Sequence, residues 1–168
     1  MNYATIKEHD TANGTGIRVS LFVSGCTHHC KGCFNEVAWD FNYGTLFTEE
    51  TEEKILKLLD RPYIRGLSLL GGEPMEVANQ KVLLPFLKKV RERFSNTKDI
   101  WCYSGYTLEE LLDKNSRCHS ISTIPMLKLI DVLVDGEFKE ELKDLKLKFR
   151  GSSNQRILEL KDIELIEK

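Results

Sequence analysis

The sequence has little that would suit a membrane, a secretory route or a nucleic acid. No apolar run approaches the roughly 20 residues that a helix needs to span a bilayer, and the opening MNYATIKEHD lacks the apolar segment of a secretory signal. Lysine and arginine are interspersed with acidic residues, and the net charge is -2, so no basic excess favours nucleic acid. We therefore expect a cytoplasmic protein without a membrane or nucleic-acid partner.

Internal repeats, linkers and low-complexity stretches are also absent. The 168 residues, of which 41% are hydrophobic and 30% charged, suit a globular domain with a real core. They are too few for two ordinary domains. We expect a single domain over residues 1–168 that ends in a polar, frayed segment at about 161–168.

Short apolar segments alternate with helical patterns along the chain. The expected strands are residues 17–23, 66–70, 99–103, 130–135 and 155–160. Strands that alternate with helices indicate a parallel sheet with right-handed crossovers. A full eight-unit α/β barrel takes about 250 residues. The sequence therefore favours an α/β fold in the form of an open, partial β/α barrel with mostly parallel strands.

Three helices are expected between these strands. Thr48 is a candidate cap of the first helix, whose acidic first turn suits the helix dipole, and Pro62 ends it. Pro85 lies within the second helical pattern, so that helix either starts near Val82 or is kinked there. The third helix begins near Thr107.

Cysteine is scarce, and its number is odd. Three of the five cysteines lie in the stretch SGCTHHCKGC, residues 24–33. In a reducing compartment, an odd and clustered set argues against a disulfide framework and for metal or redox chemistry. Cys102 lies in an apolar run and is expected to be buried and inert, whereas Cys118 follows Arg117 in a polar segment and is a candidate surface thiol.

The clustered cysteines, Cys26, Cys30 and Cys33, have the spacing C-x3-C-x2-C. One interpretation is a zinc site, with His28 or His29 as its fourth ligand, although zinc ligands usually come as two separated pairs. The other is an iron-sulfur cluster held by thiolates. Three ligands to a four-iron cluster leave one iron open, and catalytic metal sites keep such a position for a substrate.

A tight loop, Gly71-Gly72-Glu73-Pro74, follows the second expected strand. Glycines let the backbone approach closely, proline stiffens the turn, and Glu73 or a strand-end carbonyl can accept hydrogen bonds from an ammonium group. Standing alone, such a loop is more often an ordinary turn. It lies, however, at the carboxyl end of a strand, as the cysteine loop does, and functional residues gather there in parallel sheets.

Together the two loops resemble the radical S-adenosylmethionine superfamily. The chain is more closely similar to the activating proteins of anaerobic, class III ribonucleotide reductases. The segments that carry this similarity are NGTGIR (13–18), LFVSGCTHHCKGCFN (21–35), DIWCYSGYTLEEL (99–111), LVDGEF (133–138) and FRGSSNQR (149–156). They cover nearly the whole chain in order.

The resemblance implies that Cys26, Cys30 and Cys33 hold a 4Fe-4S cluster, within a cluster loop at residues 24–35. S-adenosylmethionine would bind the open iron and be cleaved to methionine and a 5'-deoxyadenosyl radical. That radical would generate a glycyl radical on the large subunit of anaerobic ribonucleoside-triphosphate reductase. The electron would come from a reduced flavodoxin-like or ferredoxin-like protein.

The resemblance also assigns contacts to S-adenosylmethionine. The backbone of Gly32, Cys33 and Phe34 would contact the adenine, and the Gly71–Pro74 loop would bind the amino group of the methionine moiety. Many superfamily members carry a large apolar residue just before the last cysteine, where this chain has Gly32. We therefore expect a backbone role here; for the Phe34 ring, packing in the core is as good an interpretation as stacking. Many activases have aspartate where this chain has Glu73.

Several residues in the matching segments receive no single role, since binding and a structural turn explain them equally well. They are Arg18, Asn35, Ser104, Gly105, Arg150, Ser152, Ser153 and Asn154. Tyr106 is expected to pack rather than relay a radical, and His28 and His29 are expected to be exposed near the cluster or toward the partner. Two alternatives stay open: an activase of another glycyl-radical enzyme, such as pyruvate formate-lyase, and a zinc-stapled binding module.

Overall fold

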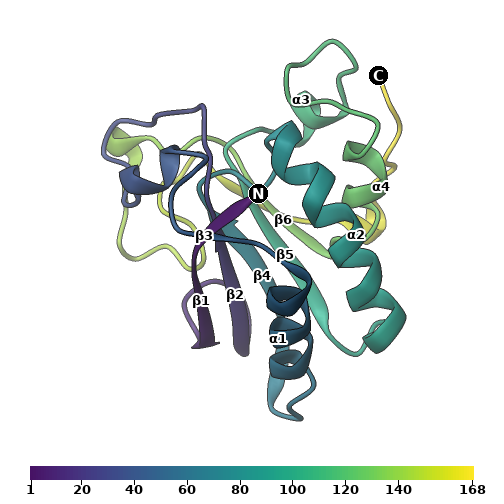
Figure 1. The fold of residues 1–168 in the computed structure, drawn as a ribbon. Coiled ribbons are helices and arrows are strands. Elements are labelled where there is room, and N and C mark those ends of the chain that lie inside the picture. Colours follow the sequence, from purple (N-terminus) through teal and green to yellow (C-terminus); the bar gives the residue numbers. More distant parts are fainter.

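A single sheet of seven strands forms the centre of the computed structural model, which describes all 168 residues (Figure 1). The strands are β1 Asn2–Asp10, β2 Ile17–Val23, β3 Thr45–Leu46, β4 Ile64–Gly71, β5 Asp99–Ser104, β6 Val132–Asp135 and β7 Arg156–Glu159. Their spatial order is β3-β1-β2-β4-β5-β6-β7. The four central strands, β2, β4, β5 and β6, pair in parallel, and β1, β3 and β7 pair antiparallel at the edges. The mixed α/β class and the mostly parallel sheet are confirmed.

The helices are short except for one. They are α1 Glu49–Leu59, α2 Val77–Phe94, α3 Leu108–Leu112 and α4 Thr123–Leu127, with 3-10 turns η1 Glu36–Trp39, η2 Glu140–Leu142 and η3 Leu160–Asp162. The expected cap is confirmed, because the Thr48 side chain accepts a backbone N–H of the first turn. The third helix begins near Thr107 as expected, and the Thr107 side chain caps it in the same way. A start of α2 near Val82 is wrong: the helix begins at Val77 and runs through Pro85. Pro85 is exposed, so water can replace the helical bond that proline removes.

Two edge strands differ from the sequence-based expectation. The first strand of the sheet, β1, was not predicted, because almost all of its residues are exposed or half-buried and give no strong apolar pattern. The last strand, β7, was predicted at nearly the right residues, but it runs antiparallel to β6 rather than continuing the parallel order. An antiparallel neighbour needs no crossover helix, and the segment that joins these two strands contains only the short 3-10 turn η2.

One face of the sheet carries the hydrophobic core. Alternate residues of β2, Val19, Leu21 and Val23, are fully buried, and they pack with Leu69 of β4 and other apolar residues of the strands and helices. Figure 1 shows α1, α2 and α4 on this face. Because the side chains of a strand alternate between faces, the intervening residues belong to the opposite face.

The opposite face is polar where the strands begin. Arg18 of β2 is fully buried there, and its guanidinium donates to Ser68 Oγ at 2.7 Å and to the carbonyls of Leu67 and Thr15. It also pairs with Asp99 at 2.6 Å. The segment before β2 and the segment before β7 cover this face, since Asn13 O accepts from Ser68 Oγ and the Phe149 ring lies 5.4 Å from that of Trp101.

The C-terminal segment is held to the molecule, so the expectation of a frayed end is wrong. Lys168 donates its backbone N–H to Leu112 O at 2.8 Å, and its own carbonyl accepts from Lys114 N at 3.0 Å. Ile163 and Leu165 pack against the core. No helix of the chain is long and apolar enough to cross a membrane.

Cys102 is fully buried, as predicted, but Cys118 is 1% exposed and not a surface thiol. The segment that carries Cys118 packs beneath α2, where Gln80 Nε2 donates to Cys118 O at 2.8 Å. The polar residues around Cys118 form a turn in which the cysteine side chain points inward. Burial raises the pKa of this thiol, which keeps it protonated and unreactive.

Replacing Arg18 tests the polar face. We expect Arg18→Ala to lower the free energy of unfolding by about 3–5 kcal/mol, because it leaves Asp99 and several polar groups without their buried partner. Arg65→Ala is the matched control: Arg65 also reaches Asp99, at 3.4 Å, but its side chain is 62% exposed, and a loss of about 0–1 kcal/mol is expected. Urea unfolding of both variants measures the difference, and equal losses would refute a structural role for Arg18.

Candidate functional site

The cysteine loop and the Gly-Gly-Glu-Pro loop meet at the carboxyl ends of β2 and β4. Gly72 N donates to Val23 O, and Glu73 N donates to Gly25 O, both at 2.8 Å. Gly71 has a φ of 113°, and a Cβ atom at Gly72 would lie 2.6 Å from Gly25 O. Both positions therefore require glycine, and the backbones of the two loops touch because of it.

The Glu73 carboxylate lies where three strand ends converge. Its side chain is 1% exposed. Oε1 accepts from Ser104 Oγ at 3.0 Å and from Gly105 N at 2.7 Å. These two residues lie at the end of β5 and just past it. Oε1 also lies 2.9 Å from His28 Nε2. Oε2 accepts only from Met75 N, at 2.9 Å. A carboxylate oxygen has two acceptor positions, so Oε2 retains capacity for another donor.

His28 lies between two carboxylates, so the expectation that it is exposed is wrong. Its side chain is 4% exposed, with Nε2 facing Glu73 and Nδ1 2.8 Å from Glu137 Oε1. Burial alone would lower the pKa of His28, but hydrogen bonds to both carboxylates and their negative charges outweigh it and raise the pKa. His29, in contrast, is exposed and stacks on Trp39, with ring centroids 4.2 Å apart.

Residues at the start of α2 form hydrogen bonds with both loops. Asn79, 1% exposed, donates from Nδ2 to Ser24 O and to Glu73 O, each at 3.0 Å. Glu76 Oε1 accepts from Thr27 N at 2.8 Å and from Thr27 Oγ1 at 2.7 Å. The residues on either side of Cys26 are thereby attached to the helix that follows the Gly-Gly-Glu-Pro loop.

All three clustered cysteines are free thiols, and all three line one cavity. Cys26 is buried, and Cys30 and Cys33 are partly exposed. Burial raises the pKa of Cys26 to about 12, and the nearby charges of Glu73 and Glu76 add to the effect. Burial and Glu137 raise the pKa of Cys30. Thiolates in this loop therefore need a bound cation to stabilise them, as iron does in a cluster.

The positions of the cysteine side chains indicate which kind of metal centre they could bind. No three His, Cys, Asp or Glu side chains converge closely enough to hold a single metal ion. A mononuclear zinc site needs its ligands at about 2.0–2.3 Å from one centre, and neither His28 nor His29 completes such a set. In a four-iron cluster each thiolate binds a different iron, so the thiols need not converge on one point. The donor set fits a cluster.

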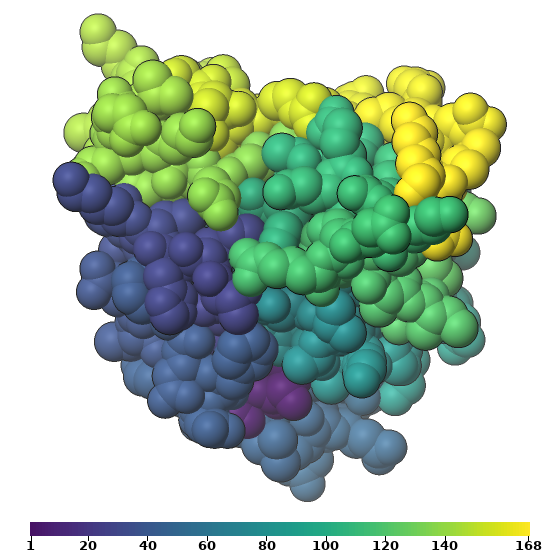
Figure 2. Space-filling model, turned by 90° about the horizontal axis from the view of Figure 1, so that it is seen from above, coloured from purple at the N-terminus to yellow at the C-terminus, as the bar shows by residue number.

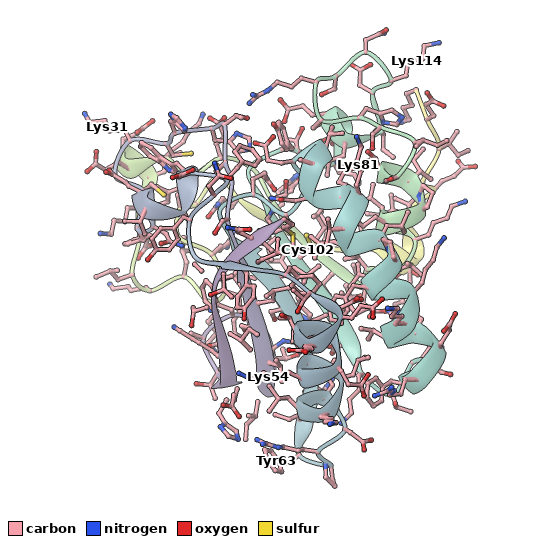
Figure 3. All side chains as sticks on the ribbon, viewed as in Figure 1. Lys31, Lys54, Tyr63, Lys81, Cys102 and Lys114 are labelled. Carbon is pink, nitrogen blue, oxygen red and sulfur yellow. The ribbon has the colours of Figure 1, made fainter.

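The cavity has a volume of about 470 Å³, within the range of small-molecule sites. Cys26, Cys30, Cys33 and the Gly71–Glu73 loop line one part of it, and residues from β5, β6 and the segment before β7 line the rest. Pro74 is buried outside the lining. Figure 3 shows Lys31 of the cysteine loop at one end of the molecule and Tyr63 at the opposite end, with Cys102 near the centre of the sheet.

Phe34 lies at the rim of the cavity. It is 73% exposed, which excludes the interpretation as a core aromatic, and its ring contacts that of Phe138 at a centroid distance of 5.3 Å. The Lys143 ammonium lies 5.0 Å from the same ring. Gly32 has a φ of 75° in a turn that glycine favours. In Figure 2 the violet-blue cysteine loop and the yellow-green residues around Phe138 lie side by side on the upper face.

The remaining sequence-based candidates divide into two groups. Ser104 and Gly105 belong to the site through their bonds to Glu73, and Asn35 lines the cavity. The others make structural contacts: Arg18 bonds across the polar face, Ser152 Oγ donates to Asn154 Oδ1, and Arg150 Nη1 donates to Gln155 O. Arg150 also lines the cavity. Tyr106 is 3% exposed and packs in the core, as predicted.

Sequence reasoning missed the residues that link the loops. Asn79 and Glu76 belong to a helix whose start was placed too late, so their position beside the cysteine loop was not visible. The only signal of this link in the sequence was a glutamate and an asparagine shortly after the Gly-Gly-Glu-Pro loop. Trp39 and Tyr103, which also line the cavity, gave no signal beyond their aromatic character.

Comparison with known proteins shows to which family the chain belongs. Residues 12–158 match the family described as a 4Fe-4S single cluster domain. The anaerobic ribonucleoside-triphosphate reductase-activating protein of Haemophilus influenzae is 45% identical over 159 residues, which are 94% of this chain and 97% of that protein. The protein of the same name from Escherichia coli K12 is 40% identical over 96% of this chain and 100% of its own length. That from Enterobacteria phage T4 is 40% identical over 94% of this chain and 93% of its own length. The chain belongs to the family of anaerobic ribonucleoside-triphosphate reductase-activating proteins.

Proposed function

We propose that this protein cleaves S-adenosylmethionine reductively and generates a glycyl radical on anaerobic ribonucleoside-triphosphate reductase. One observation carries the proposal: a loop with three free cysteines and a loop with a buried carboxylate are bonded to each other at the rim of a single cavity. The names of the relatives, which are activating proteins of that reductase, support the choice of partner.

Cys26, Cys30 and Cys33 would hold a 4Fe-4S cluster, leaving one iron open for S-adenosylmethionine. When bound, the cluster supplies one electron that breaks the carbon-sulfur bond of S-adenosylmethionine, giving methionine and a 5'-deoxyadenosyl radical that takes the α-hydrogen of a glycine. The products are then 5'-deoxyadenosine and a glycyl radical. The electron would come from a reduced flavodoxin-like or ferredoxin-like protein, and the five unpaired cysteines suit a reducing cytoplasm.

The protein's own residues would bind and orient S-adenosylmethionine. Glu73 Oε2, which accepts one hydrogen bond, can take a second from the ammonium of the methionine moiety. Gly71 and Gly72 line the cavity beside the cysteine loop, where this group would lie. Backbone atoms of Gly32, Cys33 and Phe34, at the opposite side of the loop, would contact the adenine. Pro74, which lies outside the cavity lining, restricts the backbone of the turn.

The proposed substrate is a glycine near the C-terminus of the reductase large subunit. The rim is open and partly apolar, with Phe34 exposed beside the cavity. Such an opening suits a polypeptide loop inserted by a partner. The sheet would act as the open, partial β/α barrel of the radical S-adenosylmethionine superfamily, with its cavity on the face opposite the helices.

The proposal is tested by mixing the anaerobically reconstituted protein with the large subunit of the reductase, S-adenosylmethionine and a one-electron reductant. We expect an electron paramagnetic resonance signal of a glycyl radical and the formation of 5'-deoxyadenosine. If 5'-deoxyadenosine forms with no glycyl radical, the reductase is the wrong partner. If neither product forms, and the protein contains about one zinc and no labile sulfide, the radical mechanism is wrong.

Cysteine substitutions test the cluster ligands. We expect Cys26→Ala, Cys30→Ala and Cys33→Ala each to lose most bound iron and sulfide and all detectable radical formation, with the circular dichroism spectrum retained. Cys102→Ala and Cys118→Ala are the controls and should keep a full cluster, because both thiols lie in the hydrophobic core rather than the cavity. Radical formation that survives in any of the first three variants would refute the ligand assignment.

Substitution of Glu73 tests the ammonium site. We expect Glu73→Gln to weaken S-adenosylmethionine binding about 10- to 100-fold, since a hydrogen bond between charged groups contributes about 1.5–3 kcal/mol. Iron content should stay unchanged. Glu137→Gln is the matched control: it contacts the other nitrogen of His28 and lies outside the cavity lining, so it should change binding less than about threefold. Equilibrium dialysis with labelled S-adenosylmethionine measures both, and equal effects would attribute the loss to His28 alone.

A further inference from the structure

Beyond the cysteine loop, the floor of the cavity is a single row of residues across four strands. Phe22 pairs with Leu70, and Tyr103 pairs with Val134. Leu69 pairs with Cys102, so Leu70 and Tyr103 are at the same level. All four floor residues line the cavity. The floor is therefore apolar except for one phenolic hydroxyl.

That hydroxyl is buried and has no hydrogen-bond partner in the protein. The same is true of two other polar atoms of residues that line the cavity, Trp39 Nε1 and Arg150 Nε. Native proteins pair nearly all buried polar atoms, so an unpaired one calls for an explanation. Three unpaired atoms around one cavity have a common explanation in a bound ligand.

The chemistry of these atoms limits what the ligand can be. The indole N–H and the guanidinium Nε–H can only donate, and burial raises the pKa of Tyr103 well above its ordinary value, so its hydroxyl keeps its proton. The ligand must therefore present hydrogen-bond acceptors. Around Tyr103 the ligand meets the apolar side chains of Phe22, Leu70 and Val134, so it must be largely apolar there.

We infer that Tyr103 donates a hydrogen bond to a backbone carbonyl of the substrate polypeptide and so positions the glycine in the cavity. This inference rests on the proposed function. A glycine-bearing backbone has acceptor oxygens along its length and no charged side chain at the glycine, which suits a floor of Phe22, Leu70 and Val134. The charged methionine moiety of S-adenosylmethionine suits the rim instead, where Glu73 and the cysteines lie.

Tyr103→Phe separates this role from a structural one. It removes only the hydroxyl, and because the hydroxyl has no partner in the protein, the urea midpoint should be unchanged or higher. We expect the KM for the reductase large subunit in glycyl-radical formation to rise roughly five- to tenfold, as the loss of one hydrogen bond predicts. Cleavage of S-adenosylmethionine with dithionite, measured without the reductase, should stay within about twofold of the unmodified protein.

Tyr63→Phe is the matched control. Tyr63 lies at the opposite end of the molecule, where its hydroxyl is 3.0 Å from His9 Nε2, so this variant should leave the KM unchanged (Figure 3). An unchanged KM in Tyr103→Phe would overturn the inference and leave the proposed function intact. Altered S-adenosylmethionine cleavage without the reductase would also overturn it, by making the small molecule the acceptor. If the unmodified protein forms no glycyl radical, both proposals fail together.

Discussion

The site depends on one buried carboxylate. Burying a charge is costly unless hydrogen bonds replace the water it loses. Glu73 meets this condition with donors from three segments: His28 of the cysteine loop, Ser104 and Gly105 at the end of β5, and Met75 of its own loop. These donors offset the loss of water around the carboxylate. The ends of β2, β4 and β5 are thus brought to one point by a single side chain.

The backbone hydrogen bonds of the cysteine loop are concentrated around Cys26. Cys26 lies between residues that are bonded to Gly-Gly-Glu-Pro backbone, to Asn79 and to Glu76. Cys30 and Cys33 are more exposed, and apart from the Cys33 N to Cys30 O bond they contribute no backbone hydrogen bonds. Around the other two cysteines the contacts are fewer; Cys33 Sγ accepts from Asn35 N at 3.4 Å.

Much of the fold could be predicted from the sequence, because buried strands and capped helices leave local patterns. The β2 strand was predicted at its observed bounds, and Thr48 and Thr107 cap their helices. What could not be predicted depends on contacts between distant segments. The polar strand β1 forms only by pairing with β2, and Cys118 is buried only because α2 packs over it.

The same distinction holds within the site. The three cysteines and the Gly-Gly-Glu-Pro loop were recognisable as local motifs, and both line the cavity except for Pro74. His28 was misplaced because its burial comes from Glu73 and from Glu137, which is 109 residues away. Asn79 and Tyr103 carry no local pattern beyond their residue types. Their roles follow from which atoms they face, and only the assembled structure shows this.

The small size of the chain has a direct consequence for how the two faces of the sheet are used. Helices bury one face in a continuous hydrophobic core that includes Leu21, Leu69 and Cys102. The same strands present their alternate residues to the other face, where Arg18 and Ser68 form a polar base beneath the apolar floor at Tyr103. The helices thus cover one face of the sheet, whereas the segments before β2 and β7 cover the polar part of the other, and the cavity lies on that second side.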